Sequence, residues 1–274
     1  MLTNEQLHAI AALQKECQQA DDLHLKLNWD MLRQRDDHSM DFFYEENGEL
    51  IAYLALYGFG TSVEVCGMVK PSARRRQHFS TLWQTARQTI EEKGFSKILL
   101  NAPAPSTSAK AWLTAQSCTY DFSEFQLKWH QQPIEASNDV LLRKSRLEDT
   151  DFAVQLDMLA FNMSEADARL HQEEIQDGPN EQHFIIVAEG QDIGKIRVSN
   201  TDGEAYIYGF AILPEYQGKG YGGKTLCNIV KQEHEAGRSI LLDVETKNMH
   251  ALGLYEKIGF KIVQGQDYYL WHSV

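Results

Sequence analysis

The stretch QGKGYGGKT (residues 217–225) matches three different phosphate-binding patterns at once. Gly218, Gly220 and Gly223 give the G-x-G-x-x-G pattern of dinucleotide-binding folds, and the eight residues from Gly218 onward give the G-x-x-x-x-G-K-T pattern of P-loops. Starting at Gln217, the same letters fit Q/R-x-x-G-x-G/A, a loop that surrounds the pyrophosphate of coenzyme A. Glycines in such a loop let consecutive backbone N–H groups approach a phosphate closely. The rest of the chain has to distinguish the three patterns.

The length of chain that follows the loop argues against both nucleotide-binding folds. Each of them needs several more parallel strands, which return through crossovers of a dozen or more residues. Only 49 of the 274 residues follow Thr225, and they hold one buried strand, SILLDV, and a terminal pair of strands. Residues 214–216 also separate the preceding strand, AYIYGFAILP, from the glycines, whereas both nucleotide motifs place the glycine turn directly after the strand. Asp243 lies where a ribose-binding acid is expected, but the missing strands outweigh this match.

The residues around and after the loop favour the third pattern. FAILPEYQGKGYGGKTL precedes the strand SILLDV, which is followed by NMHALGLYEKIGF, residues 248–260. This order and spacing resembles the GCN5-related N-acetyltransferase (GNAT) family, in which the last helix carries N-x-x-A-x-x-L-Y-x-K-x-G-F. The resemblance is close over these stretches and extends in outline over the second half of the chain.

The resemblance implies that the second half binds acetyl-CoA as an acetyl donor, without a metal. The residues expected to bind the coenzyme are Phe210, Ala211, Ile212, Gln217, Gly218, Lys219, Gly220, Tyr221, Gly222, Gly223, Asn248 and Tyr255. The strand residues would run beside the pantetheine arm, and one of their N–H groups would polarise the thioester carbonyl. The helix after the loop would add its positive end. Lys219 would add charge or point to solvent, and Asn248 would bind the arm, cap its helix, or do both.

Tyr255 is the candidate catalytic residue. By resemblance it would donate a proton to the coenzyme A thiolate, whose pKa is about 8.5 by comparison with cysteine, while a phenol titrates near ~10. The alternative is a packing role beside Leu252 and Ile258. The general base stays open, because the strand before the loop has tyrosines where family members often have a glutamate. The remaining alternatives are a water chain and the carboxylates Glu204, Asp243 and Glu245.

The first half of the chain repeats the order of parts found in the second. Four landmarks lie between 140 and 143 residues apart: Pro71 and Pro214, Ile98 and Ile240, Ser108 and Asn248, and Trp129 and Trp271. This offset predicts a tandem duplication of two domains, 1–135 and 139–274, joined by the polar linker HQQPIEASN. The expected fold is α/β, with two GNAT-like domains, each a mixed, mostly antiparallel sheet flanked by helices.

The first copy departs from the motif where the glycine loop would be. Its sequence there is RRRQHF, residues 74–79. The landmark offset places Arg75, Gln77 and Phe79 opposite the loop glycines, and Ala115 opposite the candidate acid. Side chains there crowd the loop and restrict backbone conformations with positive φ. We therefore predict a degenerate copy that shapes or covers the acceptor site. The three arginines would hold a phosphate by charge or form a solvated turn.

Composition narrows the possible partners. The formal charge of −13 and the pI near 5.2 argue against a nucleic-acid partner. Four scattered cysteines without a C-x-x-C pair favour a reducing cytoplasm over disulfides or zinc. The N-terminal stretch MLTNEQLHAIAALQKE predicts an amphipathic helix and not a signal peptide, and no apolar run is long enough to span a bilayer.

The predicted function is acetyl transfer from acetyl-CoA to a primary amine of a small molecule or peptide, by direct attack. Residues 161–183 are expected to select the acceptor, and they contain a single arginine, Arg169. The acids of this segment are Glu165, Asp167, Glu173, Glu174, Asp177 and Glu181. They favour a cationic acceptor, or they form a solvated acidic helix. The alternative function is a non-catalytic acyl-CoA-binding sensor or scaffold.

Overall fold

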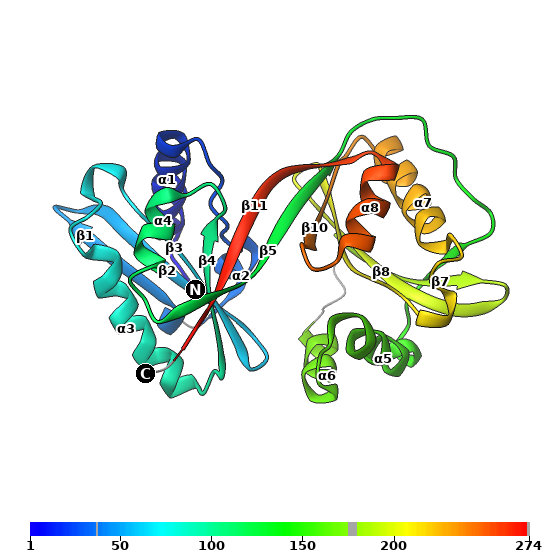
Figure 1. Ribbon diagram of the computed structural model, residues 1–274, viewed down its shortest axis with the longest axis horizontal. Coiled ribbons are helices and arrows are strands. Elements are labelled where there is room, and N and C mark those ends of the chain that lie inside the picture. The colour runs from blue at the N-terminus through cyan, green and yellow to red at the C-terminus, as the bar shows by residue number, and fades with distance from the viewer. Residues whose placement is uncertain (37, 175–179, 273–274) are drawn as a thin grey trace. The chain divides into compact units, whose positions relative to one another are not determined.

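The first half of the chain folds as strands covered on both faces by helices (Figure 1). The computed structural model describes residues 1–36, 38–174 and 180–272. The elements of the first half are α1 (Asn4–Asp21), α2 (Trp29–Gln34), β1 (Asp41–Glu46), β2 (Glu49–Phe59), β3 (Ser62–Val69), α3 (His78–Lys93), β4 (Lys97–Pro103), α4 (Thr107–Leu113) and β5 (Cys118–Trp129). A 3-10 turn, Pro71–Ala73, links β3 to the loop before α3. The expected amphipathic N-terminal helix is present as α1.

The side chains of β2 show why both faces of this sheet are covered. Successive residues of a strand point to opposite faces. Leu54 packs in the same cluster as Trp83 of α3. Its neighbour Tyr53 packs in another cluster with Ile10 of α1. All of β2 from residue 50 to 57 is buried, as expected for a central strand between two layers of helices.

The second half begins with an additional strand, β6, and then repeats these elements in the same order. Its elements are β6 (Leu141–Lys144), α5 (Thr150–Phe161), α6 (Glu165–Glu174), β7 (Glu181–Ala188), β8 (Gln191–Thr201), β9 (Glu204–Ile212), α7 (Tyr221–Glu235), β10 (Ser239–Glu245), α8 (Met249–Ile258) and β11 (Phe260–Trp271). A 3-10 turn, Pro214–Tyr216, again links the strand to the loop. Figure 1 shows α5 beside α6 and α7 beside α8. None of the described helices is long and apolar enough to cross a membrane.

Both sheets are mixed and mostly antiparallel, which confirms the expected fold class. In the first half the strands are ordered β1-β2-β3-β4, and only β3 and β4 pair in parallel. In the second half the order is β6-β7-β8-β9-β10, and only β9 and β10 pair in parallel. The parallel pair occupies the same place in both copies, as expected from a duplication.

The last strands of the two copies are exchanged between two compact units. The first unit contains Met1–Glu124 and the chain from Gln264 onward, and the second contains Phe125–Val263. Residues Gln266–Leu270 of β11 pair with β4, and Trp271 stacks edge-on against Trp83 at 5.6 Å between ring centroids. The indole of Trp129, at the end of β5, instead donates to the carbonyl of Ile258 at 2.8 Å. The units therefore differ from the predicted domains 1–135 and 139–274 by this exchange. No pattern in the sequence indicates the exchange.

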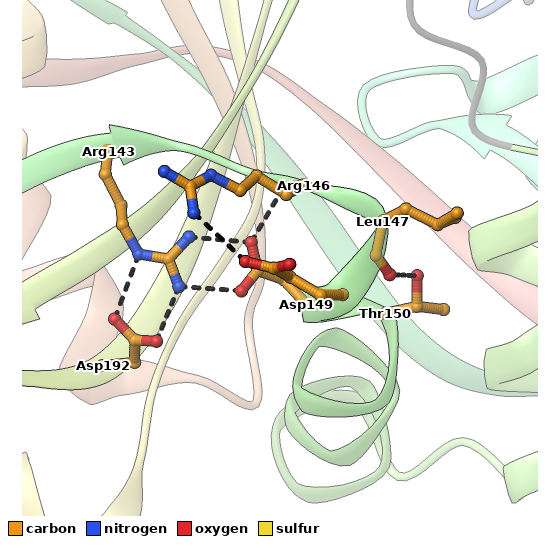
Figure 2. A network of polar contacts seen from close by, with 7 residues as sticks. Arg143, Arg146, Leu147, Asp149, Thr150 and Asp192 are labelled. Atoms are coloured by element: carbon orange, nitrogen blue, oxygen red, sulfur yellow. Dashed lines mark hydrogen bonds and ion pairs between the residues drawn. The ribbon is translucent and has the colours of Figure 1, made fainter.

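A charged network fixes the chain where it enters α5 (Figure 2). The Arg143 guanidinium at the end of β6 donates to both carboxylate oxygens of Asp149, each at 2.7 Å, and also bonds Asp192 at the start of β8. Asp149 accepts a further bond from the backbone N–H of Arg146 at 2.8 Å. These hydrogen bonds, the one from Arg143 first, lower the pKa of Asp149 below its usual range. The network ties two strands to the first turn of α5.

Candidate active site

The glycine loop before α7 has the open left-handed backbone that an anion site needs. Gly218 has φ of +72° and Gly220 has φ of +87°. A Cβ added at either position would meet no atom within 4 Å. Helix α7 begins at Tyr221 without a side-chain cap, so the first N–H groups of the helix lack intrahelical acceptors. Unfilled space, free N–H donors and the positive end of the helix dipole together suit a phosphate group.

The side chains of the loop hold it against the preceding strand. Gln217 donates from Nε2 to the carbonyl of Ile212, the last residue of β9, at 2.7 Å. Lys219 is exposed and its ammonium lies 4.9 Å from the ring centroid of Tyr216. Tyr221 is buried, and its hydroxyl donates to Glu189 at 2.5 Å. Because its side chain is buried and bonded to Glu189, Tyr221 would contact a ligand at the loop through its backbone.

Strand β9 contains a bulge beside the loop. Gly209 has φ of +53°, and the register with β8 shifts between Lys195 and Arg197. Two residues of β9, Gly209 and Phe210, therefore lie opposite the single residue Ile196. The parallel ladder between β9 and β10 runs only as far as the pair Ile207 and Leu242. Beyond that pair no further β9–β10 pairing is found among the residues that the structure describes, so the backbone of Gly209, Phe210 and Ala211 on the side facing β10 lies outside this ladder. This bulge was not expected from the sequence.

Three elements converge on the first turn of α7. An added Cβ on Gly222 would lie 3.6 Å from the ring of Phe210 and 3.4 Å from Leu254 of α8. On Gly223 it would lie 3.5 Å from Leu254. These glycines therefore allow strand, helix and α8 to approach closely. Ala211, next along β9, is buried against Leu156 of α5.

Tyr255 lies on α8 at the edge of the core of the second unit. Its side chain is 8% exposed, and its ring packs edge-on against Phe260 at 6.0 Å. Burial raises the pKa of Tyr255 to about 12, so the phenol is protonated at neutral pH. Asn248 caps the same helix, since its Oδ1 accepts the N–H of Ala251 at 3.1 Å. The structural alternative proposed for Asn248 is thus present.

The three carboxylates named as possible bases lie at different places. Glu204 begins β9, five residues before the bulge, which corresponds to about 16 Å along a strand. Asp243 is hydrogen-bonded by Tyr206, whose pKa is raised by burial and by this carboxylate. The Tyr206 hydroxyl also accepts from Gln126 at 2.9 Å. Glu245 is exposed at the end of β10. Of the three, Asp243 lies nearest to the bulge in sequence register, because it directly follows Leu242, the partner of Ile207.

Among the acids of residues 161–183 with described side chains, Glu165, Asp167 and Glu173 lie on α6 and Glu181 lies on β7. Glu165 pairs with Arg169 one turn later at 2.9 Å, and Asp167 accepts the hydroxyl of Ser164, whose own oxygen caps the helix. Asp177 lies outside the described residues. The two alternatives for this segment are selection of a cationic acceptor and a solvated acidic helix. These interactions match the solvated acidic helix.

The loop of the first unit keeps the backbone geometry of the glycine loop without its glycines. Arg75 has φ of +67° and Gln77 has φ of +65°, at the positions of Gly218 and Gly220. Arg74 donates from Nε to the carbonyl of Val69 at 3.2 Å, the equivalent of the bond from Gln217. The side chains therefore do not prevent positive φ, although the left-handed conformation costs them roughly 1–2 kcal/mol each. The expectation that side chains at these positions restrict positive φ is therefore corrected, because Arg75 and Gln77 both adopt it.

Side chains instead fill the start of α3 in the first unit. The ring of Phe79 packs edge-on against Trp112 of α4 at 4.8 Å, and the Trp112 indole donates to the Ser80 hydroxyl at 3.1 Å. Strand β3 pairs with β2 without a register shift, so the first unit has no counterpart of the Gly209 bulge.

The helix caps also correct the alignment of the two copies. Ser106 caps α4 through the N–H of Ala109, as Asn248 caps α8. The landmark opposite Asn248 is therefore Ser106 and not Ser108. With this register Leu113 lies opposite Tyr255, in place of Ala115. Leu113 is buried and apolar, so the first unit still lacks the hydroxyl.

Comparison with known proteins finds one family at both copies. The model of the acetyltransferase (GNAT) family matches residues 4–114 and 151–260. A [ribosomal protein bS18]-alanine N-acetyltransferase of Haemophilus influenzae is 37% identical over 86 residues, which are 31% of this chain and 58% of that protein. The chain thus aligns with less than two thirds of the length of the curated relatives it matches.

Solved structures show the same fold over nearly the whole chain. A GCN5-related N-acetyltransferase from Sphaerobacter thermophilus superposes with a TM-score of 0.77 at 18% identity, over 96% of this chain and 91% of that one. A tandem GNAT protein from the clavulanic acid biosynthesis pathway superposes with a TM-score of 0.69 at 15% identity, over 98% and 96%. At these identities the likeness concerns the fold.

Proposed function

Because this chain belongs to the GNAT family, we propose that its second unit transfers the acetyl group of acetyl-CoA to a primary amine by direct attack. The observation that carries the proposal is the open glycine loop at the start of α7, next to the bulge of β9. The first unit has the same loop backbone but neither the free space nor the bulge. An amine acceptor is also in keeping with the name of the Haemophilus influenzae relative, an alanine N-acetyltransferase.

The loop and the first turn of α7 would hold the diphosphate of the coenzyme. Gly218 and Gly220 leave the space that a Cβ would occupy, and the N–H groups at the start of the helix are unpaired. Gln217 would act indirectly, by fixing the loop to β9. Lys219 is exposed and would add charge near the phosphates. The coenzyme supplies the activated acetyl thioester, and every other step depends on protein groups.

The bulge would place a backbone donor at the reacting carbonyl. Around Gly209 and Phe210 the strand leaves its regular ladder, so an N–H group on the side facing β10 is free to donate. A preorganised donor of this kind stabilises negative charge on oxygen and is typically worth ~3–4 kcal/mol. Residues 210–212 would line the pantetheine arm with their backbone.

Tyr255 would stabilise the leaving sulfur. Its pKa of about 12 lies above the value of about 8.5 expected for a thiol, so complete proton transfer to the thiolate is unfavourable in the free protein. A strong hydrogen bond from the phenol to the developing thiolate is therefore the proposed contribution, with the proton following as the product leaves. The apolar surroundings strengthen such a bond.

An acceptor panel with thiol detection tests the proposal. Purified chain is incubated with acetyl-CoA and single amines, and free coenzyme A is measured as thiol. Amine-dependent thiol release that falls in Tyr255→Phe supports acetyl transfer. Coenzyme A binding without release for any amine would instead support the non-catalytic binding module and would refute the proposed enzyme.

A further inference from the structure

A small cavity lies beside the bulge within the second unit. It has a volume of about 60 Å³ and is lined by Ser145 and by residues of α5, α6 and the strands β7, β8 and β9. Gly209, the residue with positive φ in the bulge, forms part of its wall. The polar residues of the wall include His171, His183, Lys195 and Arg197. The cavity therefore adjoins the place proposed for the thioester and presents cationic side chains to it.

One of the two cations is already neutralised. Lys195 donates to Asp157 at 2.6 Å, and Asp157 is only 1% exposed. Gln172 donates to the second oxygen of the same carboxylate at 2.5 Å. Both oxygens of Asp157 and the charge of Lys195 are therefore engaged with each other and with the amide.

The other cation, Arg197, has one guanidinium N–H, at Nε, without a hydrogen-bond partner among the described residues. Its guanidinium lies 4.9 Å from the ring centroid of Tyr208, a contact that covers one face and makes no hydrogen bond. The carboxylate of Glu181 is 4.0 Å from Nε, too far for a hydrogen bond. Nε is buried and has no hydrogen-bond partner among the residues that the structure describes. A buried guanidinium N–H left unpaired is costly, which points to an acceptor supplied by a ligand.

His171 adds no full charge to this wall at neutral pH. Burial, and then the positive charges of Arg197 and Lys195, lower the pKa of His171 despite the opposing effect of Asp157. His171 is therefore neutral at pH 7 and offers one donor and one acceptor. His183 lies 3.9 Å from Glu181, which is also the carboxylate nearest to Arg197. One guanidinium fork is thus the main anion-binding group of the cavity.

We propose that Arg197 binds the carboxylate of the acceptor, so that the acceptor is a small amino carboxylate. The proposal rests on the proposed acetyl transfer and specifies its substrate class. A guanidinium matches the two oxygens of a carboxylate in its planar fork. With a volume of about 60 Å³ the cavity has room for a group as small as a carboxylate. A single guanidinium, with the Glu181 carboxylate 4.0 Å from its Nε, also suits a single negative charge better than a phosphate dianion.

The position of the cavity connects this binding to the reaction. Because Gly209 forms part of both the bulge and the cavity wall, a bound carboxylate lies next to the reacting carbonyl. The amine of an amino acid is two bonds away from its carboxyl carbon. Such an amine would therefore reach the thioester while the carboxylate remains on Arg197. The acidic outer face of α6 has no part in this arrangement.

The test compares amines that differ only in the carboxylate. Glycine, alanine and glutamate are assayed against glycinamide, alaninamide and glutamic acid α-amide, by thiol release from acetyl-CoA. The wild type should show a kcat/KM at least about 10- to 100-fold higher for the carboxylate of at least one pair, the range expected for hydrogen bonds to a charged group. Arg197→Gln should remove this preference while its kcat/KM for the amide stays within about threefold. Arg197→Lys should restore only part of it, because lysine lacks the planar fork.

Arg169→Gln serves as the matched control. Arg169 pairs with Glu165 and Asp151 on the exposed surface, so its removal should leave the preference unchanged. A wild type that prefers the amides, or an Arg197→Gln variant that loses activity on both members of a pair equally, overturns the carboxylate proposal while acetyl transfer stands. Coenzyme A binding without transfer to any of the six amines, or to a wider panel of primary amines, refutes acetyl transfer and this proposal together.

Discussion

The ring of Phe79 lies over Gly67 in the first unit, with one ring carbon 2.7 Å from the position that a Cβ of Gly67 would occupy. In the second unit the two residue types are exchanged between the same positions. Phe210 lies on the strand and Gly222 on the helix, and the ring is 3.6 Å from an added Cβ. An aromatic ring therefore fills the gap between strand and helix in both units. Only in the second unit does the start of the helix stay free of a side chain.

Substitution of Gly222 by Phe should place an aromatic ring at the start of α7, as Phe79 does at the start of α3 in the first unit. Gly222→Phe places a ring at the start of α7, beside the proposed phosphate site, and should weaken coenzyme A binding by tenfold or more. Calorimetry measures this affinity, and circular dichroism checks that the variant is folded. The matched control is Phe79→Ala, which should leave the affinity of the full chain unchanged. Equal affinities in wild type and Gly222→Phe would show that the coenzyme does not approach this turn.

Removal of the Tyr255 hydroxyl should slow the chemical step. Tyr255→Phe should lower kcat by about 10²–10³-fold while the affinity for acetyl-CoA stays similar, as expected when a preorganised hydrogen-bond donor to a developing charge is removed. Tyr120→Phe, at an exposed tyrosine of the first unit, serves as the control. A kcat within about threefold of the wild type would assign Tyr255 to packing against Phe260.

The raised pKa of Tyr255 also predicts how kcat depends on pH. A phenol with a pKa of about 12 stays protonated through the whole range in which enzymes are usually assayed. The pH profile of kcat is compared between wild type and Tyr255→Phe. An unperturbed tyrosine would give the wild type a decrease of kcat near pH ~10 that the variant lacks. We expect the wild type to show no such decrease. Such a decrease would show that the hydroxyl is exposed to water in the working enzyme.

The bulge at Gly209 should matter more for activity than for stability. Gly209→Ala forces an alanine into φ of +53°, which costs roughly 1–2 kcal/mol or displaces the bulge. Gly203→Ala is a close control, because Gly203 has φ of +81° and equally open space in the turn before β9. Both variants should lose similar stability in urea, but only Gly209→Ala should lose kcat. Equal activity in the two variants would remove the bulge from the proposed mechanism.

The Arg143–Asp149 network should make the second unit sensitive to acid. The pKa of Asp149 is lowered in the folded protein, so its contribution to stability is present above the unfolded value of about 3.9 and is lost as the pH falls through the folded value. Asp149→Asn should lower the free energy of unfolding by about 1–3 kcal/mol at pH 7, with a smaller deficit near pH 3. Glu148→Gln, at an exposed neighbour, should show neither effect. A constant deficit at both pH values would contradict a charge-based role.

Much of the fold followed from the sequence because the duplication and the glycine loop are local patterns. The order of strands and helices, the mixed sheets and the lack of a tyrosine opposite Tyr255 could be predicted in this way. The exchange of the last strands could not. The strands ending in Trp129 and Trp271 are similar in composition, so either would fit either sheet, and their partners are set by tertiary packing.

Two features of the site lay beyond sequence patterns for physical reasons. The bulge adds one residue to β9, and a single insertion leaves no signal apart from Gly209 itself. Arg197 lies on β8, outside every motif, and its proposed role follows from an Nε–H that has no hydrogen-bond partner among the described residues.

Equilibrium titration of the full chain with coenzyme A tests the central claim most directly, because it counts the sites and locates them. The account predicts saturation at one coenzyme A per chain, since Phe79 and Trp112 fill the equivalent place in the first unit. Gly218→Asp combined with Gly220→Asp adds two carboxylates where the diphosphate would lie and should abolish binding in a chain that remains folded. Saturation at two per chain, or retained binding of one by the double variant, would contradict the assignment of the glycine loop as the coenzyme site.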